Sequence, residues 1–355
     1  MVWRKRVIFQ NKKGVRYGYT NKLFISDKGY NSISMLGALK NSNGEIGPVN
    51  CGGISEDKNL SLLKAFSESL ERRALVYGAK TVDNTNYSLA YDLISQSVAQ
   101  IDVKYTKFSI QPPFVDTTGT ATHPVPERAI FNAVSELIEK NSIFLFWYGE
   151  IGKKINDSSK SFYSDYLIKQ GYKLNFFLID YFFPFKVVIT IAFSEKNPIK
   201  FKFGIGSGLD LSSAIYKSLS EAYLLGSYYE VLYHNNQKGF LSEDDQKEFS
   251  KFQSTDVLDY LYNLMNNSDE INNDDIHFLN EKNIYQCLPK WIKNLLITML
   301  PQSLKKDVVV VKAFSPQLFN HVPKKSYLDL DAEINLRTIR LRQKDLNIIP
   351  DCPII

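Results

Sequence analysis

A nine-residue pattern occurs three times in this chain, at residues 64–72, 132–140 and 217–225. Each copy has a Ser-Glu pair at its fourth and fifth positions, although the third copy keeps the rest of the pattern more weakly. Each copy also follows a short glycine-bearing stretch, at residues 51–53, 117–120 and 204–208. A repeated unit of this kind constrains the fold more than any single motif does. We interpret each copy as a glycine turn followed by an amphipathic helix.

The first two copies separate polar from apolar side chains when they are drawn as helices. With about 3.6 residues per turn, side chains three or four positions apart lie on the same face. In the first copy, the apolar stripe holds Leu62, Phe66, Leu70 and Ala74. Its polar stripe holds Lys64, Glu68, Glu71 and Arg72. The polar stripe of the second copy holds Arg128, Asn132, Glu136, Glu139 and Lys140.

These two Glu-x-x-Glu edges have a chemical use if they face each other. Four carboxylates with interleaved cations would form a site for hard metal ions and a polyphosphate. The alternative is that both stripes are solvated helix faces with ordinary charge pairs four residues apart. Because the Ser-Glu frame recurs, each time after glycine, the pattern favours a site.

Bulk composition narrows the function classes. The 355 residues are 44% hydrophobic and carry a net charge of +5, which is too small to indicate nucleic-acid binding. The three cysteines are scattered and form no CxxC pair, so we expect neither a disulfide framework nor a zinc site, and we expect a cytoplasmic protein. We find no signal-peptide pattern, no membrane-spanning run and no GxxxxGKS or GxxxxGKT phosphate loop.

The other stretches predict the surrounding elements. We expect helices over residues 58–79 and from about 124 to 147, two strands over residues 173–193 broken at Pro184, and a buried strand at residues 308–311. Residues 1–50 read as strands or loops, residues 235–283 as a peripheral polar insertion with a helical patch at 257–264, and residues 331–342 as a charged helix or extended arm.

Residues 53–72, residues 113–121 continuing into 136–140, and residues 204–209 continuing into 220–222 resemble the YcaO family. The resemblance implies an α/β fold: a single YcaO-like domain over residues 1–355, with repeated glycine-turn and helix units around a central nucleotide site. Residues 51–230 would hold the core motifs, and residues 284–355 a C-terminal strand and tail. The resemblance also implies an ATP- and Mg²⁺-dependent enzyme that phosphorylates a peptide-bond oxygen. The best-known branch cyclises Cys, Ser or Thr onto the preceding carbonyl, which gives thiazoline or oxazoline rings in ribosomal peptides.

The resemblance also implies which residues form the site. The implied ATP-binding residues are Lys64, Glu68, Glu71, Arg72, Arg128, Asn132, Glu136, Glu139, Lys140, Lys217 and Glu221. The implied Mg²⁺ ligands are Glu68, Glu71, Glu136 and Glu139. No catalytic residue is assigned, because the nucleophile would come from the substrate. We therefore interpret Cys51 as structural, and His123 as a loop histidine bonded to the backbone.

Several positions depart from the family pattern. Ala121, Pro124 and Arg128 stand where the family has a serine, an asparagine and a glutamate. Lys140 replaces an arginine, which keeps the charge but loses the bidentate fork. Two interpretations follow: a remodelled active site in which Lys64, Arg128 and Lys140 take over phosphate contacts, or a degenerate copy that scaffolds another subunit. The retained carboxylates and cations favour the active site.

We therefore expect the cyclodehydratase component of an azoline synthetase, with a thioamide- or amidine-forming enzyme as the alternative within the family. The precursor peptide would be the substrate, a ubiquitin-activating-like partner protein would bind its leader, and a flavin dehydrogenase could oxidise the rings afterwards. A homodimer is a further expectation, whereas nucleic acid and a membrane are not expected partners. Pro350 and Pro353 only partly match the proline-alternating tail of azoline-forming members, so a disordered tail is the alternative there.

Overall fold

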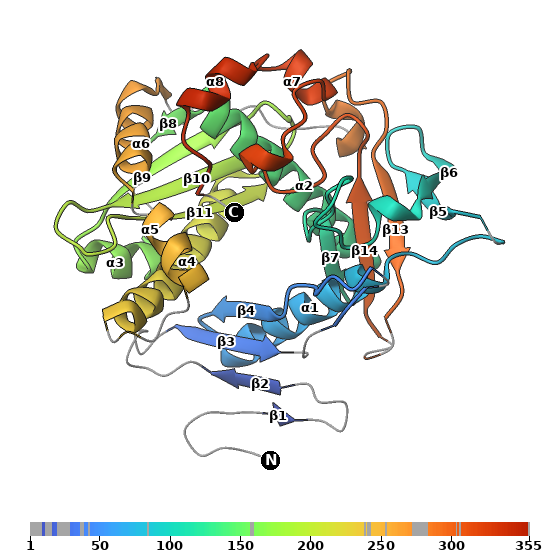
Figure 1. The fold of residues 1–355 in the computed structure, drawn as a ribbon, viewed down its shortest axis with the longest axis horizontal. Helices are drawn as coiled ribbons and strands as arrows, with labels where there is room; N and C mark the ends of the chain where they lie inside the picture. Colours follow the sequence, from blue (N-terminus) through green and yellow to red (C-terminus); the bar gives the residue numbers. More distant parts are fainter. Residues whose placement is uncertain are drawn as a thin grey trace. The chain divides into compact units, whose positions relative to one another are not determined.

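The computed structural model describes residues 9–10, 16–19, 29–35, 39–41, 43–83, 85–156, 160–237, 239, 243–252, 254–271, 283–302, 304 and 307–353. These residues form two compact units, each assembled from separate segments of the chain. The first unit is Met1–Lys140 with Lys290–Val322, and the second is Asn141–Pro289 with Pro323–Ile355. Both units mix helices with mainly antiparallel sheets (Figure 1), so the expected α/β class is confirmed. The prediction of one domain over residues 1–355 remains a prediction.

The first unit begins with a small antiparallel sheet covered by a helix. Strands β1 (Phe9–Gln10), β2 (Arg16–Tyr19), β3 (Tyr30–Met35) and β4 (Asn50–Ser55) are paired in sequence order. Helix α1 (Lys58–Tyr77) starts at Asp57, whose carboxylate accepts the Leu60 amide as an N-cap, and packs on β3 and β4. This packing places the polar stripe of the first repeat beside β4.

A second sheet completes the first unit. Its strand order is β6 (Ser97–Asp102), β5 (Tyr87–Asp92), β13 (Leu296–Leu300), β14 (Val309–Phe314) and β7 (Thr120–His123). A short 3-10 turn, η2 (Val103–Tyr105), follows β6, and α2 (Pro126–Gly149) begins directly after β7. The apolar side of α1 packs against β14 and β13 through a buried cluster that includes Leu70, Leu75, Leu300 and Val310. This core holds α1 next to β7.

The second unit is organised around one sheet and one long helix. Its strand order is β11 (Phe201–Gly208), β10 (Lys186–Phe193), β9 (Lys173–Ile179), β8 (Lys153–Ile155) and β12 (Glu270–Ile271). Helix α4 (Leu211–Gln237) follows β11 and packs along β11 and β10. The remaining helical elements are α3 (Phe162–Lys169), α5 (Glu243–Phe252), α6 (Thr255–Asn267), η4 (Ile284–Cys287), η5 (Lys325–Tyr327), α7 (Glu333–Arg337) and α8 (Gln343–Ile348).

Most predicted elements are confirmed, within a few residues at their ends. The two long helices appear as α1 and α2, the pair of strands as β9 and β10, and the valine run as β14. The helical patch at 257–264 lies in α6, whose Val257, Leu261 and Leu264 are buried. The predicted arm at 331–342 contains only the short helix α7. Residues 1–8, 20–28 and 272–282 lie outside the described residues, so the predictions there are not tested.

The prediction of glycine turns at residues 51–53 and 204–208 was wrong. These residues lie in strands β4 and β11. Glycine is needed there for close packing. A Cβ built on Gly53 would overlap the Ser61 carbonyl oxygen and the Ala65 amide of α1, and one on Gly206 would meet α4 in the same way. Only the second stretch contains a turn, where Gly119 has a φ of +72°.

We expect Gly53→Ala to lower the free energy of unfolding by about 1–3 kcal/mol, because the backbone of α1 would have to move away from β4. Urea unfolding of the purified protein measures this change. Gly208→Ala is the matched control, since its added Cβ would lie 3.1 Å from the Asp210 oxygen, a contact that small shifts can relieve. Equal losses in the two variants would contradict this account of the repeat.

Within the described residues, no helix is both long enough and apolar enough to cross a membrane.

Candidate active site

Each repeat ties its helix to the preceding strand through the glutamate of the Ser-Glu pair. In every copy, one carboxylate oxygen accepts a hydrogen bond from the backbone amide sixteen residues earlier. The three pairs are Gly52 N to Glu68 at 2.6 Å, Thr120 N to Glu136 at 3.2 Å, and Ile205 N to Glu221 at 3.4 Å. The repeat seen in the sequence is therefore also a repeat in three dimensions.

In the first and third copies, a lysine adds a second hydrogen bond between the helix and the preceding strand. Lys64 Nζ donates to the Ile54 carbonyl oxygen at 2.9 Å, and Lys217 Nζ donates to the Ser207 carbonyl oxygen at 2.7 Å. Both lysines are exposed, and each bonds to the residue ten positions earlier in the chain. The structure thus gives these two predicted phosphate contacts a local structural partner.

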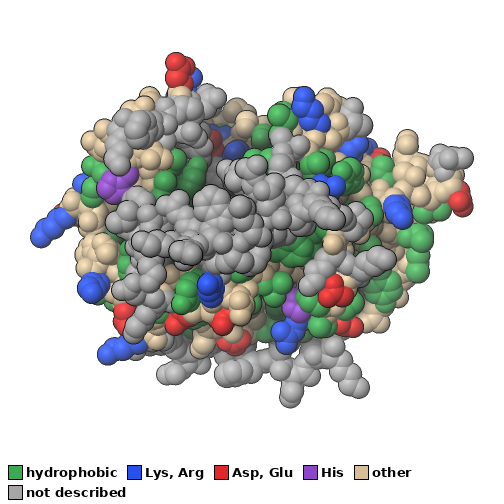
Figure 2. Space-filling model, turned by 90° about the horizontal axis from the view of Figure 1, so that it is seen from below, with side chains coloured by type: hydrophobic (Ala, Val, Ile, Leu, Met, Phe, Trp, Pro, Cys, Tyr) green, Lys and Arg blue, Asp and Glu red, His purple; other side chains and the backbone are tan. Residues whose placement is uncertain are grey.

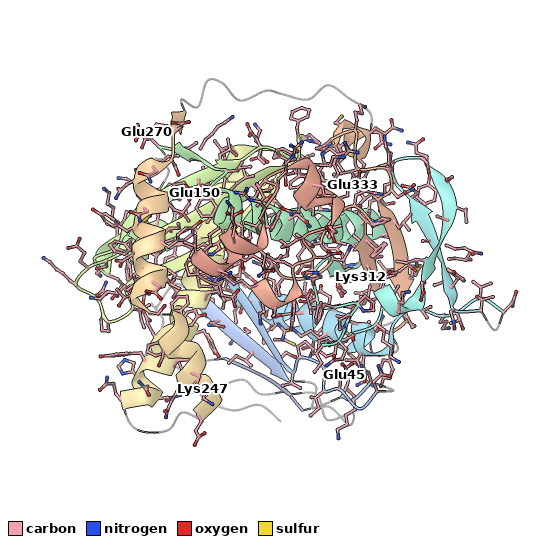
Figure 3. All side chains as sticks on the ribbon, turned by 45° about the horizontal axis from the view of Figure 1, so that its top comes forward. Glu45, Glu150, Lys247, Glu270, Lys312 and Glu333 are labelled. Carbon is pink, nitrogen blue, oxygen red and sulfur yellow. The ribbon has the colours of Figure 1, made fainter. Side chains whose placement is uncertain are left out.

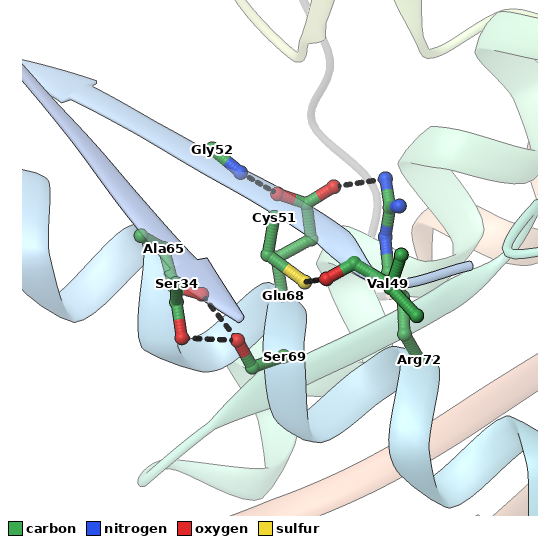
Figure 4. Close-up of polar contacts among 8 residues, drawn as sticks. All are labelled: Ser34, Val49, Cys51, Gly52, Ala65, Glu68, Ser69 and Arg72. Carbon is green, nitrogen blue, oxygen red and sulfur yellow. Dashed lines mark hydrogen bonds and ion pairs between the residues drawn. The ribbon is translucent and has the colours of Figure 1, made fainter. Parts of the chain in front are cut away.

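Glu68 also binds Arg72 on the same helix (Figure 4). One oxygen of Glu68 accepts the Gly52 amide and the other pairs with the Arg72 guanidinium at 2.5 Å. Cys51 lies beside this pair and donates its thiol to the Val49 carbonyl oxygen. Burial, and then the charge of Glu68, raises the pKa of the Cys51 thiol to about 11. Cys51 therefore stays protonated at neutral pH, which agrees with its predicted structural role.

Strand β7 brings a carboxylate of each of the first two helices to neighbouring amides. The Thr122 amide donates to Glu71 of α1 at 2.7 Å, while the Thr120 amide donates to Glu136 of α2. The carboxylates of Glu71 and Glu136 therefore bind amides of the same strand, as expected if the polar faces of the two helices lie toward each other. Both residues are only partly buried by surface area, but protein atoms surround each carboxylate closely enough to disfavour its charge.

The pKa values of these carboxylates reflect that crowding. Burial, and then the charge of Glu68, raises the pKa of Glu71 to about 8, although the Thr122 amide and Arg72 act in the opposite direction. Burial also raises the pKa of Glu136 well above its usual range, Lys140 opposes this rise, and Glu71 and Glu139 reinforce it. The site thus concentrates acidic groups that repel one another.

Lys312 of β14 (Figure 3) is a member of this cluster that the sequence analysis missed. Its side chain is fully buried, and its Nζ donates to the carbonyl oxygens of Asp116 and Thr118 at 2.9 and 2.5 Å. Burial lowers the pKa of Lys312 to about 8, against the attraction of Asp116 and Glu136. The available signal was a lysine that directly follows a run of buried valines, because a buried strand rarely carries an uncompensated charge.

The remaining predicted residues divide between the two units. Glu139 and Lys140 are partly buried and act on the charge of Glu136. Arg128 and Asn132 are exposed, and within the described part of the chain the Arg128 side chain pairs with no carboxylate. Lys217 and Glu221 belong to α4 of the second unit. His123 accepts the Val125 amide at its Nδ1, so the expected backbone bond is present, but the prediction of a loop was wrong because His123 is the last residue of strand β7.

Comparison with known proteins decides the family. The family model described as "YcaO cyclodehydratase", ATP- and Mg²⁺-binding, matches residues 83–318, which is more than half of the chain. The chain belongs to the YcaO family. The cofactors expected from the sequence, ATP and Mg²⁺, are those that this family description names.

Solved structures show the same fold at low sequence identity. A YcaO protein from Methanopyrus kandleri, bound with AMPPCP and Mg²⁺, has a TM-score of 0.64 and 13% identity over 89% of each chain. A chain of the Escherichia coli microcin synthetase McbBCD complex with pro-MccB17 bound has a TM-score of 0.67 and 17% identity over 96% of each chain. A heterocyclase in complex with substrate and cofactor has a TM-score of 0.66 and 13% identity, over 97% of this chain and 54% of the heterocyclase chain. No curated protein matches in sequence.

The residues of this YcaO chain fit a metal-bound nucleotide. The charge of Glu68 raises the pKa of Glu71, the charges of Glu71 and Glu139 raise the pKa of Glu136, and a divalent cation would offset this repulsion. Arg72 Nε and the hydroxyls of Thr118 and Thr120 are buried without a hydrogen-bond partner among the described residues. In the same residues, no three potential ligands are gathered closely enough to form a ready-made metal site. The donor set therefore suits a cation that is also held by the nucleotide's phosphates.

The raised pKa of Glu71 predicts a pH dependence of stability in this YcaO protein. Between pH 4.5, its ordinary pKa, and pH 8, the folded state binds more protons at Glu71 than the unfolded state does. The free energy of unfolding should therefore fall as pH rises through this window, by at most about 1.4 kcal/mol per pH unit for this group. Urea unfolding without Mg²⁺ measures the slope, and Glu71→Gln should flatten it. A stability that rises across the same window in both proteins would contradict the assignment.

Proposed function

We propose that this protein is an ATP- and Mg²⁺-dependent peptide cyclodehydratase that forms thiazoline or oxazoline rings from Cys, Ser or Thr of a ribosomal precursor peptide. The observation that carries the proposal is the convergence of Glu71 and Glu136 on strand β7, with the buried ammonium of Lys312 close enough to influence Glu136. Family membership supplies the expected nucleotide and metal.

The proposed reaction needs a phosphoryl acceptor on the peptide itself. A substrate side chain attacks the preceding carbonyl carbon, and the carbonyl oxygen becomes the hydroxyl of a tetrahedral adduct. ATP bound with Mg²⁺ would supply the phosphoryl group that this oxygen accepts. The ring C–N double bond forms as the C–O bond breaks, phosphate departs and the amide proton is lost. The peptide loses one water, and ATP becomes ADP and phosphate.

The chain's own residues would hold the charges of this reaction. We propose that Glu68, Glu71, Glu136 and Glu139 are the Mg²⁺ ligands, and that Arg72 and Lys140 contact the phosphates. To reach a metal ion, the Glu68 carboxylate would have to release the Gly52 amide. Its ion pair with Arg72 can be kept during this rotation. Fixed positive groups lower the energy of the transferring phosphoryl group without having to reorganise.

The other implied contacts stay proposals with different support. Lys64 and Lys217 already bind strand carbonyls, so each would share its ammonium with a phosphate. Arg128 and Asn132 are exposed on α2 and free to move toward a ligand. Glu221 repeats the strand bond of Glu68 and Glu136.

The proposed partners follow from the same chemistry. A precursor peptide is the substrate, a ubiquitin-activating-like protein would recognise its leader, and a flavin dehydrogenase would oxidise the rings. The neighbours described as a synthetase complex with pro-MccB17 and as a heterocyclase with substrate support a peptide and partner proteins. We also propose the cytoplasm as the compartment, which suits three free cysteines.

The experiment incubates the protein with ATP, Mg²⁺, a candidate precursor peptide and a candidate leader-binding partner protein, then measures released phosphate and peptide mass. Loss of one water per phosphate supports the proposal. An exchange of oxygen for sulfur, when sulfide is supplied, would instead assign the thioamide branch, and gain of an amine with loss of water the amidine branch. No phosphate release with any precursor, while the protein still binds its partner, would contradict the proposal and assign the scaffold role instead.

A further inference from the structure

The loop after β14 places His321 beside the segment that leads into β7. The backbone amide of Val322 donates to one carboxylate oxygen of Asp116 at 2.7 Å, and the amide of Thr118 donates to the other at 2.8 Å. Asp116 therefore ties this loop to the turn before β7. The first residue of β7 then holds Glu136 through its amide, so His321 belongs to the same part of the first unit as the candidate active site.

Two aromatic rings and a backbone carbonyl hold the imidazole of His321 in one orientation. The Phe114 ring lies edge-on at 6.0 Å and the Phe319 ring at 5.4 Å, measured between ring centroids. The Nδ1 atom lies 2.9 Å from the carbonyl oxygen of Val322. A carbonyl oxygen can only accept a hydrogen bond, so Nδ1 carries the proton. In the neutral ring, Nε2 therefore holds the lone pair that can take up a proton.

The surroundings of His321 favour its neutral form. Burial lowers the pKa of the imidazole below its ordinary value of 6.5, and the charge of Lys312 on β14 acts in the same direction. The bond to the Val322 carbonyl oxygen opposes this fall, as does the charge of Asp116 in the segment before β7. His321 is therefore unprotonated at neutral pH, as a general base has to be.

The other histidines in the described part of the chain do not offer the same chemistry. Nδ1 of His123 accepts the Val125 amide, so its neutral ring carries the proton on Nε2 and already uses its acceptor. His234 is exposed near the end of α4, in the second unit. Nor do the described residues gather three potential metal ligands around any histidine, and the histidine side chains visible in Figure 2 lie apart from one another.

We propose that His321 takes the proton from the substrate side chain that attacks the peptide carbonyl. This role rests on the proposed function, in which a thiol or hydroxyl has to become a nucleophile. As the sulfur or oxygen forms its bond to the carbonyl carbon, its proton passes to Nε2 and the carbonyl π electrons move to oxygen. The imidazolium then gives this proton to that oxygen, which becomes the hydroxyl of the tetrahedral adduct. The step consumes no other proton donor or acceptor.

His321→Asn tests the role, because the asparagine amide can still donate to the Val322 carbonyl oxygen but cannot act as a base. Ring formation on a serine-containing precursor should fall by about 10²–10⁴-fold. The loss on a cysteine-containing precursor should be smaller, since a thiol with a pKa of about 8.5 ionises more readily than a hydroxyl. His234→Asn, at an exposed position, is the control and should change turnover less than about twofold.

The pH profile separates a base from a structural residue. In the wild type, kcat/KM should fall as pH drops below about 6.5, because His321 gains a proton and can no longer accept one. The His321→Asn variant should lack this fall and should bind AMPPCP with Mg²⁺ as the wild type does. A structural role would lower stability and leave the shape of the pH profile unchanged, which would overturn the proposal.

A second measurement needs no activity. Long-range ¹H–¹⁵N NMR of the imidazole rings, with the His321 signals assigned by their loss in His321→Asn, should show a proton on Nδ1 and a titration midpoint below 6.5. A proton on Nε2, or a midpoint above 6.5, would overturn the proposal. A His321→Asn variant as active as the wild type would overturn the role of His321 alone, whereas a wild type that releases no phosphate would overturn the proposed function, and this role with it.

Discussion

Glu136→Gln should reduce ATP-dependent turnover by about 10²–10³-fold, the loss typical of removing one preorganised charged group from a reacting centre. Glutamine keeps the size of the side chain and one oxygen that can still accept the Thr120 amide. The substitution therefore removes the charge and leaves the β7–α2 connection in place. Phosphate release with precursor peptide and partner protein measures the effect.

Glu127→Gln is the matched control for this prediction. Glu127 lies in the first turn of the same helix and is exposed, so its loss should change turnover less than about twofold and stability by a few tenths of a kcal/mol. Equal turnover in the Glu136 variant and the wild type would mean that the carboxylates on β7 do not hold the metal-bound nucleotide.

Lys312→Met should lower the free energy of unfolding by roughly 1–3 kcal/mol, the cost of leaving buried hydrogen-bond acceptors without their donor. The substitution leaves the carbonyl oxygens of Asp116 and Thr118 without their donor and leaves Glu136 without a nearby buried cation. Urea unfolding measures the loss. Lys293→Met, at an exposed position, is the control and should cost little.

A double-mutant cycle separates the two roles of Lys312. If the ammonium stabilises the ionised form of Glu136, the combined variant Glu136→Gln with Lys312→Met should lose about 0.5–3 kcal/mol less than the sum of the single losses. If Lys312 acts only through the two carbonyl oxygens, the losses will add. Additive losses would remove Lys312 from the electrostatics of the site and leave it a structural residue.

The sequence predicted the repeat because its signal is local. A Ser-Glu pair at a fixed place relative to the apolar stripe specifies which helix face carries the glutamate, and the amide bonds of Glu68, Glu136 and Glu221 confirm that the three copies make the same strand contact. The long helices and the β9–β10 pair were predictable for the same reason. Their apolar period and their proline positions are read within a few neighbouring residues.

The failures concern features that depend on distant segments. Glycine marks either a turn or a close approach of two backbones, and nothing near Gly53 or Gly206 in the sequence reveals the helix that packs against them. Lys312 is buried because β14 pairs with β13 and β7, which no local pattern discloses. Arg128, which stands where the family has a glutamate, is exposed in the first turn of α2, and its phosphate contact stays a prediction.

The most direct test of the account is a calorimetric titration of the purified protein with AMPPCP, with and without Mg²⁺. We expect binding that requires Mg²⁺ and that weakens at least about tenfold in Glu71→Gln and in Glu136→Gln, as is typical for loss of a metal ligand or its close partner. Binding that is equally strong without Mg²⁺ or in both variants would contradict the central claim that these carboxylates hold a metal-bound nucleotide.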